Sequence, residues 1–273
     1  MSVYSALQLL KYTHAVVCRI PTSLETKSKI NIEEARKQHE AFVKLLRELY
    51  LDVIELPADE SLPECGFVED TAIVCNGIAL MTKPDSAVRQ KEVEIIKHVL
   101  KKEIGLTVMD IDVPNAKLHG GDVLFTGREF FIGLSTSTNE AGAMAVAEAF
   151  PEFPCTIVKV PDGTRLKHHI TLAGPDLLSV GSGDAAREVL HRVQREASFQ
   201  EYMKITVPED CAANVLYING TIVHRSENEA PQSYQLFCDK IDYHRRSLSV
   251  SELSAASCGL TSCCLLVRKT RHI

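Results

Sequence analysis

Short apolar runs, each led by a small or polar residue, recur along the whole chain. The six runs are His14-Ala-Val-Val, Asp70-Thr-Ala-Ile-Val, Asp122-Val-Leu-Phe, His169-Ile-Thr-Leu, Asn214-Val-Leu-Tyr-Ile and Cys263-Cys-Leu-Leu-Val. The steps between their leading residues are 56, 52, 47, 45 and 49 residues. A period of roughly 50 residues predicts a propeller or another repetitive array. An ordinary α/β sheet with the same spacing is the alternative.

Four segments between these runs have the apolar spacing of amphipathic helices. Asn31 can cap the first helix, and its apolar face carries Ala35, His39, Phe42, Leu46 and Leu49. The second segment covers residues 86–103, and Gly105 provides its stop. The other two cover residues 140–150 and 184–200. Each repeat unit is therefore expected to combine a buried strand, a helix and further strands.

Such units need neighbours to cover their apolar faces, and a closed ring covers all of them. Six leading residues fit a five-bladed ring only if the first and last segments share a blade. In a ring, the leading ends of the inner strands point at the central axis, and residues in matching register share a direction. Asp70, Asp122, Asn214 and Cys263 stand in matching register. We therefore expect Cys263, rather than Cys264, to face the channel.

Composition and charge narrow the class of protein. Apolar residues make up 45% of the 273 residues and the formal charge is −6, which fits one globular domain over residues 1–273. Without a run of Lys and Arg, nucleic acid is not expected as a partner. No apolar stretch approaches the length of a membrane span, and the first residues lack a secretory signal pattern. We expect a cytoplasmic protein, monomeric or alternatively homodimeric.

The chain has nine cysteines, an odd number, and most of them lie inside apolar runs. Free cysteine in such surroundings behaves as a small buried apolar residue. Paired CxxC motifs, the usual mark of a structural zinc site, are missing from the sequence. We expect reduced thiols and no bound metal.

Several longer stretches are similar to one known family. They are Glu55-Leu-Pro-Ala-Asp-Glu-Ser-Leu-Pro-Glu-Cys-Gly-Phe-Val-Glu-Asp70, Gly120-Gly-Asp-Val-Leu-Phe-Thr-Gly-Arg-Glu-Phe-Phe-Ile-Gly-Leu-Ser135, Ala173-Gly-Pro175, Ala212-Ala-Asn-Val-Leu-Tyr217 and Ser262-Cys-Cys264. In this order they resemble the dimethylarginine dimethylaminohydrolases. The resemblance implies an α/β fold of the pentein type, a five-bladed α/β propeller with pseudo-fivefold repeats around a central channel. It also implies a cytosolic hydrolase that converts N-methylated arginine to citrulline and amine, with no cofactor.

Hydrolysis of a guanidinium group places definite demands on a site. The group is cationic, planar and resonance-stabilised, so paired carboxylates must hold it while a thiolate attacks its central carbon. The amine then leaves, and water hydrolyses the thiouronium intermediate. Because the amine gains a proton and the water loses one, a group that titrates near neutral pH, usually histidine, is needed.

The resemblance assigns roles to particular residues. Cys263 matches the nucleophile, Asp70 matches the carboxylate that holds the guanidinium, and Glu69 matches the carboxylate that supports the catalytic histidine. Phe67 matches an aromatic residue lining the pocket. Arg89, which we expect to be exposed, matches an arginine that grips the substrate's α-carboxylate.

The departures from the family pattern are concentrated in the same site. Arg165 occupies the position of the catalytic histidine, and arginine cannot exchange protons near neutral pH. His119 replaces a functional carboxylate, and Glu64 replaces an aspartate that helps to bind the guanidinium. Ser137 replaces the second arginine for the substrate carboxylate, and Cys258 replaces an aspartate near the nucleophile. Methylarginine should therefore bind weakly.

Another histidine could replace the missing acid/base. His168 and His169 are expected to lie too far away, because in an extended strand His169 is about 13 Å beyond Arg165. His119 is the better substitute acid/base, with Arg165 pairing with Glu69. A further hypothesis is that His119 and Cys263 together bind a metal ion.

Three functions remain open at this point. The chain could be a working amidine hydrolase with impaired activity or altered specificity, acting on a methylarginine or another small guanidine. It could instead be a non-catalytic descendant that keeps the fold for binding or regulation. An oxidation or nitrosation sensor built on Cys263 is the third possibility.

Overall fold

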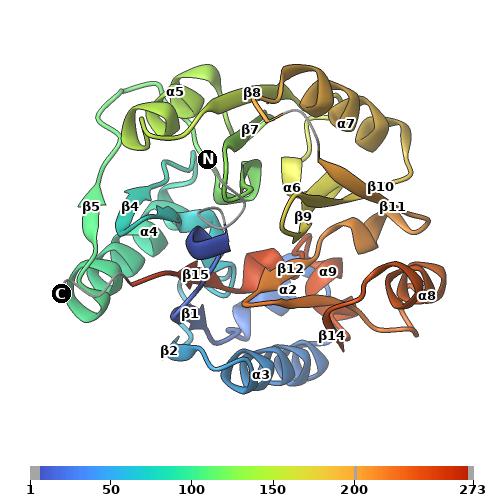
Figure 1. The fold of residues 1–273 in the computed structure, drawn as a ribbon. Helices are drawn as coiled ribbons and strands as arrows, with labels where there is room; N and C mark the ends of the chain where they lie inside the picture. Colours follow the sequence, from blue (N-terminus) through green and yellow to red (C-terminus); the bar gives the residue numbers. More distant parts are fainter. Residues whose placement is uncertain (1–6, 200–201, 270–273) are drawn as a thin grey trace.

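Five three-stranded sheets stand around a central axis, with the longer helices on the outside of the ring (Figure 1). This is seen in a computed structural model that describes residues 7–199 and 202–269. The blades are β15 (Leu265–Val267), β1 (His14–Cys18) and β2 (Asp52–Leu56); β3 (Ala72–Cys75), β4 (Ile78–Met81) and β5 (Thr107–Met109); β6 (Val123–Phe125), β7 (Phe130–Leu134) and β8 (Cys155–Lys159); β9 (Ile170–Gly174), β10 (Leu177–Gly181) and β11 (Met203–Val207); and β12 (Leu216–Ile218), β13 (Thr221–Arg225) and β14 (His244–Leu248).

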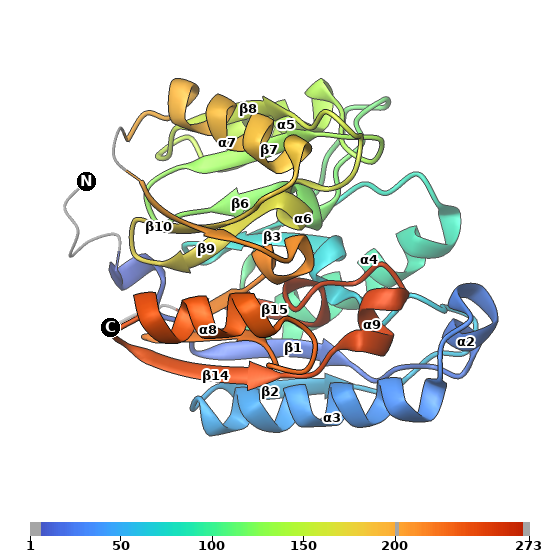
Figure 2. The same cartoon turned by 90° about the vertical axis from the view of Figure 1, so that its right-hand side faces the viewer.

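All five blades are built to the same plan. The inner strand pairs antiparallel with the middle strand, and the middle strand pairs parallel with the outer strand. A parallel neighbour requires a crossover, and a helix supplies it in each blade. These helices are α3 (Ile32–Glu48), α4 (Ala87–Val99), α5 (Glu140–Ala149), α7 (Asp184–Glu196) and α8 (Pro231–Lys240). Their position on the outside of the ring is clear in both views (Figures 1 and 2).

Two ends of the chain close the ring. The last strand, β15, pairs antiparallel with β1, and its register sets Val267 opposite His14 and Leu265 opposite Val16. The prediction that the first and last segments share a blade is therefore confirmed. The predicted α/β propeller with five repeats is confirmed with it.

The buried apolar residues fill the spaces between neighbouring blades. Val16 of β1 and Ala79 of β4 belong to one buried cluster, and Leu80 of β4 and Phe130 of β7 belong to the next. Alternate residues of a strand thus face opposite neighbours, as the two-residue period of a strand requires. The core is in this way distributed around the ring, and it leaves the axis to polar side chains.

The predicted helices are present, with corrections at their ends. Asn31 caps α3 by accepting a hydrogen bond from the Glu34 amide. After α4 the chain makes a π-helical turn over Leu100–Ile104 before Gly105, which has a left-handed φ of 82°. The helix predicted over 184–200 ends at Glu196, and Gln200 lies outside the described residues.

Most of the leading residues of the repeats lie in short helical turns. The expectation that they stand in matching register at the ends of the inner strands is thereby corrected. The turns are η1 (Val68–Thr71), η3 (Gly120–Asp122), α6 (Leu166–His169), η4 (Asp210–Ala213) and η5 (Thr261–Cys263), and each precedes the inner strand of its blade. Since these turns gather near the axis, they are the elements that position the site. None of the helices in the described ranges is long and apolar enough to cross a membrane.

Candidate active site

Asp70 of η1 is a buried acid at the centre of the site, with 2% of its surface exposed. Its Oδ2 accepts a hydrogen bond from Arg89 Nη1 at 2.7 Å and lies 3.2 Å from His119 Nε2. Arg165 Nη1 lies 3.8 Å from Oδ1, which has no hydrogen-bond donor. Burial alone would raise the pKa of the Asp70 carboxyl, but His119 and Arg89 hold it well below its usual range.

Arg89 belongs to the interior of this cluster, so the expectation of an exposed side chain is wrong. It is 8% exposed, and its guanidinium also donates to Glu92 Oε2 at 2.8 Å and to the carbonyl of Phe67 at 3.2 Å. Burial raises the pKa of Glu92 above its ordinary value, and Arg89 opposes that shift. The arginine assigned by resemblance to a substrate carboxylate is thus bound by two carboxylates of the chain itself.

His119 precedes η3 and is held by both ring nitrogens. Its Nδ1 accepts a hydrogen bond from the Gly121 amide at 3.2 Å, so in this arrangement the ring proton lies on Nε2. That proton points at Asp70. The turn can come this close to η1 only because residue 120 is glycine, since a Cβ there would lie 1.9 Å from the carbonyl oxygen of Glu69.

Arg165 is the cap residue in front of α6. The next amide, that of Leu166, donates to Oδ1 of the buried Asp122 at 2.9 Å, which fixes the start of the helix. Residues 166–169 form a helical turn, so the extended path expected for His168 and His169 is wrong. His169 pairs with Asp162 at 3.2 Å, away from Asp70. Burial lowers the pKa of His168 to about 4.

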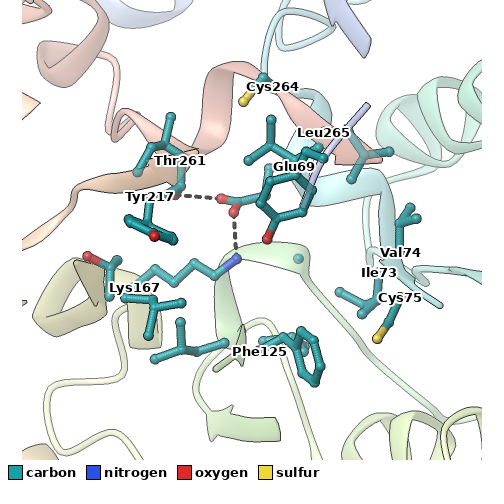
Figure 3. A pocket seen from close by; sticks show the side chains of 18 of the residues that line it. Glu69, Ile73, Val74, Cys75, Phe125, Lys167, Tyr217, Thr261, Cys264 and Leu265 are labelled. Atoms are coloured by element: carbon teal, nitrogen blue, oxygen red, sulfur yellow. Dashed lines mark hydrogen bonds and ion pairs between the residues drawn. The ribbon is translucent and has the colours of Figure 1, made fainter. Parts of the chain in front are cut away.

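Glu69 is held by Lys167 and Thr261, and neither partner was predicted. Lys167 Nζ donates to Oε1 at 2.5 Å and Thr261 Oγ1 donates to Oε2 at 2.7 Å (Figure 3). The expected pairing of Arg165 with Glu69 is therefore wrong. Lys167 lies two residues further along a helical turn, which directs it to Glu69 while Arg165 is directed to Asp70. The only sequence signal for Lys167 was its place two residues after Arg165, which matches the position of the family's catalytic histidine.

Cys263 ends η5 with its side chain fully buried, and its closest polar neighbour is another thiol. Its Sγ lies 3.4 Å from Cys258 Sγ, and both sulfurs contact the carbonyl of Gly259. Cys264 is directed elsewhere, into the cavity of Figure 3 with Glu69 and Lys167. The two adjacent thiols, which register distinguished in the sequence, thus lie in different surroundings.

Asn214 joins three turns at the axis. Its Nδ2 donates to the carbonyl of Lys167 and to Thr261 Oγ1, and its Oδ1 accepts from the Thr261 amide at 3.0 Å. Residue 259 must be glycine for this contact, because a Cβ there would lie 2.4 Å from Asn214 Oδ1. One asparagine therefore sets the position of η5, and with it Cys263, relative to α6.

Thiols and acids occupy one region of the axis. Thr261 of η5 touches Glu69, Asp70 acts electrostatically on Cys258, and Cys258 touches Cys263. The Glu69–Lys167 pair also borders a separate cavity of about 130 Å³, lined by Ile73, Phe125 and other residues (Figure 3).

The remaining predicted residues have different surroundings. Phe67 is buried in the same apolar cluster as Cys258 and Cys263. Glu64 pairs with the half-exposed Lys27 at 2.5 Å, and the Ser137 amide donates to Ser135 Oγ. Among residues 7–199 and 202–269, no three His, Cys, Asp or Glu side chains gather as a metal-binding group.

Comparison with solved structures defines the class of fold. The chain superposes on dimethylarginine dimethylaminohydrolase from Pseudomonas aeruginosa, a cysteine-to-serine mutant in complex with citrulline, with a TM-score of 0.82, 23% identity and coverage of 94% of this chain and 99% of the other. It superposes on the N-terminal domain of ArgZ, a cyanobacterial arginine dihydrolase, with a TM-score of 0.77, 16% identity and coverage of 95% and 98%. The fold is therefore the pentein propeller.

Sequence comparison gives the family. Residues 14–172 match the model of the eukaryotic N,N dimethylarginine dimethylhydrolases. The chain is 34% identical to "Putative hydrolase DDAH2" of Homo sapiens over 95% of this chain and 96% of the relative. It is 28% identical to the N(G),N(G)-dimethylarginine dimethylaminohydrolase of Pseudomonas aeruginosa over 70% and 72%. This chain belongs to the dimethylarginine dimethylaminohydrolase family.

Proposed function

We propose that this chain is a cysteine-dependent amidine hydrolase of its family with strongly reduced activity on methylated arginine. The observation that carries the proposal is the position of Arg165, whose guanidinium lies 3.8 Å from the one Asp70 oxygen that lacks a hydrogen bond. That oxygen is where a substrate guanidinium would be held. The chain places a guanidinium of its own beside it.

Electrostatics explains the loss of affinity. The buried carboxylates of Asp70 and Glu92 are already balanced by the guanidinium groups of Arg89 and Arg165. A cationic substrate would add a charge beside Arg165. Two like charges about 5 Å apart repel by about 3 kcal/mol at an effective dielectric constant of about 20, which is roughly 100-fold in affinity.

The second reason for reduced activity is that the site lacks an efficient group for proton transfer. In the proposed reaction Cys263 Sγ attacks the guanidinium carbon, the amine departs, and water then hydrolyses the thiouronium. Among the residues that the structure describes, His119 is the one imidazole paired with Asp70, but its Nδ1 is occupied by the Gly121 amide. It can serve as acid/base only through Nε2. If it does so, His119→Ala abolishes the residual turnover, and unchanged turnover would contradict that role.

Three variants at one position separate charge from proton transfer. Purified protein is incubated with asymmetric dimethylarginine and a panel of guanidines, and citrulline and released amine are measured. Arg165→Ala should lower KM only, because it removes the repelling charge and supplies no acid/base. Arg165→His should also raise kcat by at least about 100-fold, the usual contribution of general acid/base catalysis. Arg165→Lys, which keeps the charge, should resemble the unmodified protein.

Cys263→Ala is the control for every measurement. Turnover of dimethylarginine by the unmodified chain at rates typical of the family, abolished by Cys263→Ala, would refute the reduced activity. No gain in Arg165→His would show that Arg165 is not the obstacle.

A non-catalytic binding role is the second candidate, because the chain's own ion pairs already satisfy much of the acidic site. Labelling of Cys263 by a haloacetamidine separates the two. Labelling together with turnover of any guanidine supports the hydrolase. Stabilisation of the fold by neutral citrulline, without labelling or turnover, supports the binding role.

A further inference from the structure

Cys258 and Cys263 form a close thiol pair that the proposed hydrolysis does not use as a pair. Their sulfur atoms are 3.4 Å apart, and the side chains are 3% and 0% exposed. Both sulfurs also lie against one carbonyl, that of Gly259, at 3.3 and 3.8 Å. The two thiols therefore face each other inside a buried apolar cluster, beside one carbonyl oxygen.

The pair needs little movement to form a covalent bond. A disulfide has a sulfur–sulfur distance of about 2.05 Å, so the sulfurs must approach by roughly 1.4 Å. Cys258 lies in the link between α9 (Ser251–Ala255) and η5, next to the exposed Ser257 with its left-handed φ of 62°. The Cys263 side is fixed by Thr261, whose amide is held by Asn214. Movement is thus expected on the Cys258 side.

We propose that Cys258 and Cys263 are a reversible oxidation site, at which a hydroperoxide converts the two thiols to a disulfide. In the first step the sulfur of Cys263 attacks the peroxide, the O–O bond breaks, and sulfenic acid and water form. In the second step the sulfur of Cys258 displaces the sulfenic oxygen, which leaves as water with the proton of the Cys258 thiol. Two thiols and one hydrogen peroxide thus give one disulfide and two waters.

The surroundings divide the roles of the two thiols. Burial, the contact with Cys263 and the negative charge of Asp70 together raise the pKa of the Cys258 thiol well above its ordinary value. A thiol that keeps its proton is a poor first attacker on peroxide but supplies the proton that the departing oxygen needs. Cys263 is therefore the attacking residue and Cys258 the resolving one.

This site goes beyond the proposed hydrolase, since its oxidation depends on the two sulfurs and not on turnover. Its consequence for any chemistry at Cys263 is direct, because a disulfide removes the nucleophile. A reductant restores it. The Cys258 partner would also protect Cys263 from irreversible oxidation to sulfinic acid.

The test uses the whole protein and a mass measurement, so it remains valid if the hydrolase proposal fails. Fully reduced protein is treated with one equivalent of hydrogen peroxide, alkylated, and digested with chymotrypsin, which can cut after Leu260 between the two cysteines. We expect a linked pair of peptides that has lost the mass of two hydrogens and separates on reduction. Peptide mapping is necessary because Cys18 and Cys65 are also neighbours, with both sulfurs on the carbonyl of Arg19. Their linkage would be a different product.

Two variants complete the design. Cys258→Ser removes the resolving thiol, so Cys263 treated with at least three equivalents of hydrogen peroxide should gain the mass of two or three oxygens, one from each peroxide consumed, and not recover with reductant. Cys264→Ser, the matched control at the adjacent buried thiol, should form the Cys258–Cys263 link as the unmodified protein does. Circular dichroism verifies folding, and Cys258→Asp is the replacement if the serine variant does not fold. Three results with the unmodified protein would each overturn the proposal. They are oxidation of Cys263 without the link to Cys258, a link to Cys264 instead, and no reaction at either Cys258 or Cys263.

Discussion

Asp70 determines the charge of the site, because His119, Arg89 and Arg165 are all directed at its carboxylate. A buried carboxylate can stay ionised only when such partners compensate for the water it has lost. The compensation is mutual, since Arg89 is also buried and depends on Asp70 and Glu92. These residues therefore contribute to the stability of the ring as well as to any chemistry.

Removal of Arg89 tests this dependence. Arg89→Met keeps much of the side-chain volume but leaves the buried Glu92 without its cation and Asp70 with only His119 and Arg165, so we expect the free energy of unfolding to fall by about 3–5 kcal/mol. Arg19→Met is the matched control, because Arg19 pairs with Glu55 at an exposed position and its loss should change the free energy of unfolding far less. Urea unfolding at pH 7 measures both. Equal effects of the two substitutions would show that the buried pair is not important for stability.

Sequence reasoning proposed residues for the candidate site mainly where they belonged to contiguous motifs. Glu69, Asp70 and Cys263 stand in such motifs, and the choice of Cys263 over Cys264 by register stays a prediction. Lys167 and Thr261 were missed because their meeting at Glu69 depends on turns from two different blades. No local pattern records which side chains will converge after folding.

At the level of elements, the helices were predicted from the sequence more accurately than the segments in front of the inner strands. The spacing in α3 and its Asn31 cap are local properties, so the sequence contains them fully. The turns in front of the inner strands are different. In α6 the buried Asp122, from another blade, fixes the first amide, and this long-range hydrogen bond turns an apparently extended segment into a helical one. The error in placing His168 and His169 has that cause.

The buried face of α3 makes a pH-dependent contribution to stability. His39 lies on this face with its Nε2 unpaired, and burial lowers its pKa to about 4. Between pH 6.5 and about 4 the unfolded chain binds a proton at this residue and the folded chain does not, so stability falls as the pH falls through this range. From pH 7 to pH 5 the loss due to His39 should be about 2 kcal/mol.

His39→Leu should remove that part of the pH dependence, and urea unfolding at pH 7 and pH 5 measures the change. His191→Leu, at an exposed position of α7, is the control and should keep the slope of the unmodified protein. If His39→Leu left the slope unchanged, the stability loss would have to arise elsewhere, for example at His168.

At the level of the whole molecule, the ring resembles a repeat array whose two ends have been joined. The repeat period predicted units, and the need to cover their apolar faces predicted closure. The shared blade followed from counting six leading residues for five blades, and the pairing of β15 with β1 agrees with it. The angle and order at which turns meet on the axis could not be read in this way, because they depend on packing between units far apart in sequence.

Closure makes the stability of the ring depend on its last strand. A chain that ends at Leu260 would leave β1 without its antiparallel neighbour, remove Thr261 from Glu69, and uncover the apolar faces of the first and second blades. Because the segments that β15 joins are far apart in sequence, no local structure can replace these contacts.

We expect the chain that ends at Leu260 to lose its cooperative thermal transition and the near-ultraviolet circular dichroism of packed aromatic residues. A chain that ends at Lys269, whose amide still donates to Thr13 Oγ1, should keep both. A sharp transition in the shorter chain, at the temperature of the longer one, would mean that four blades and an open fifth are stable without closure.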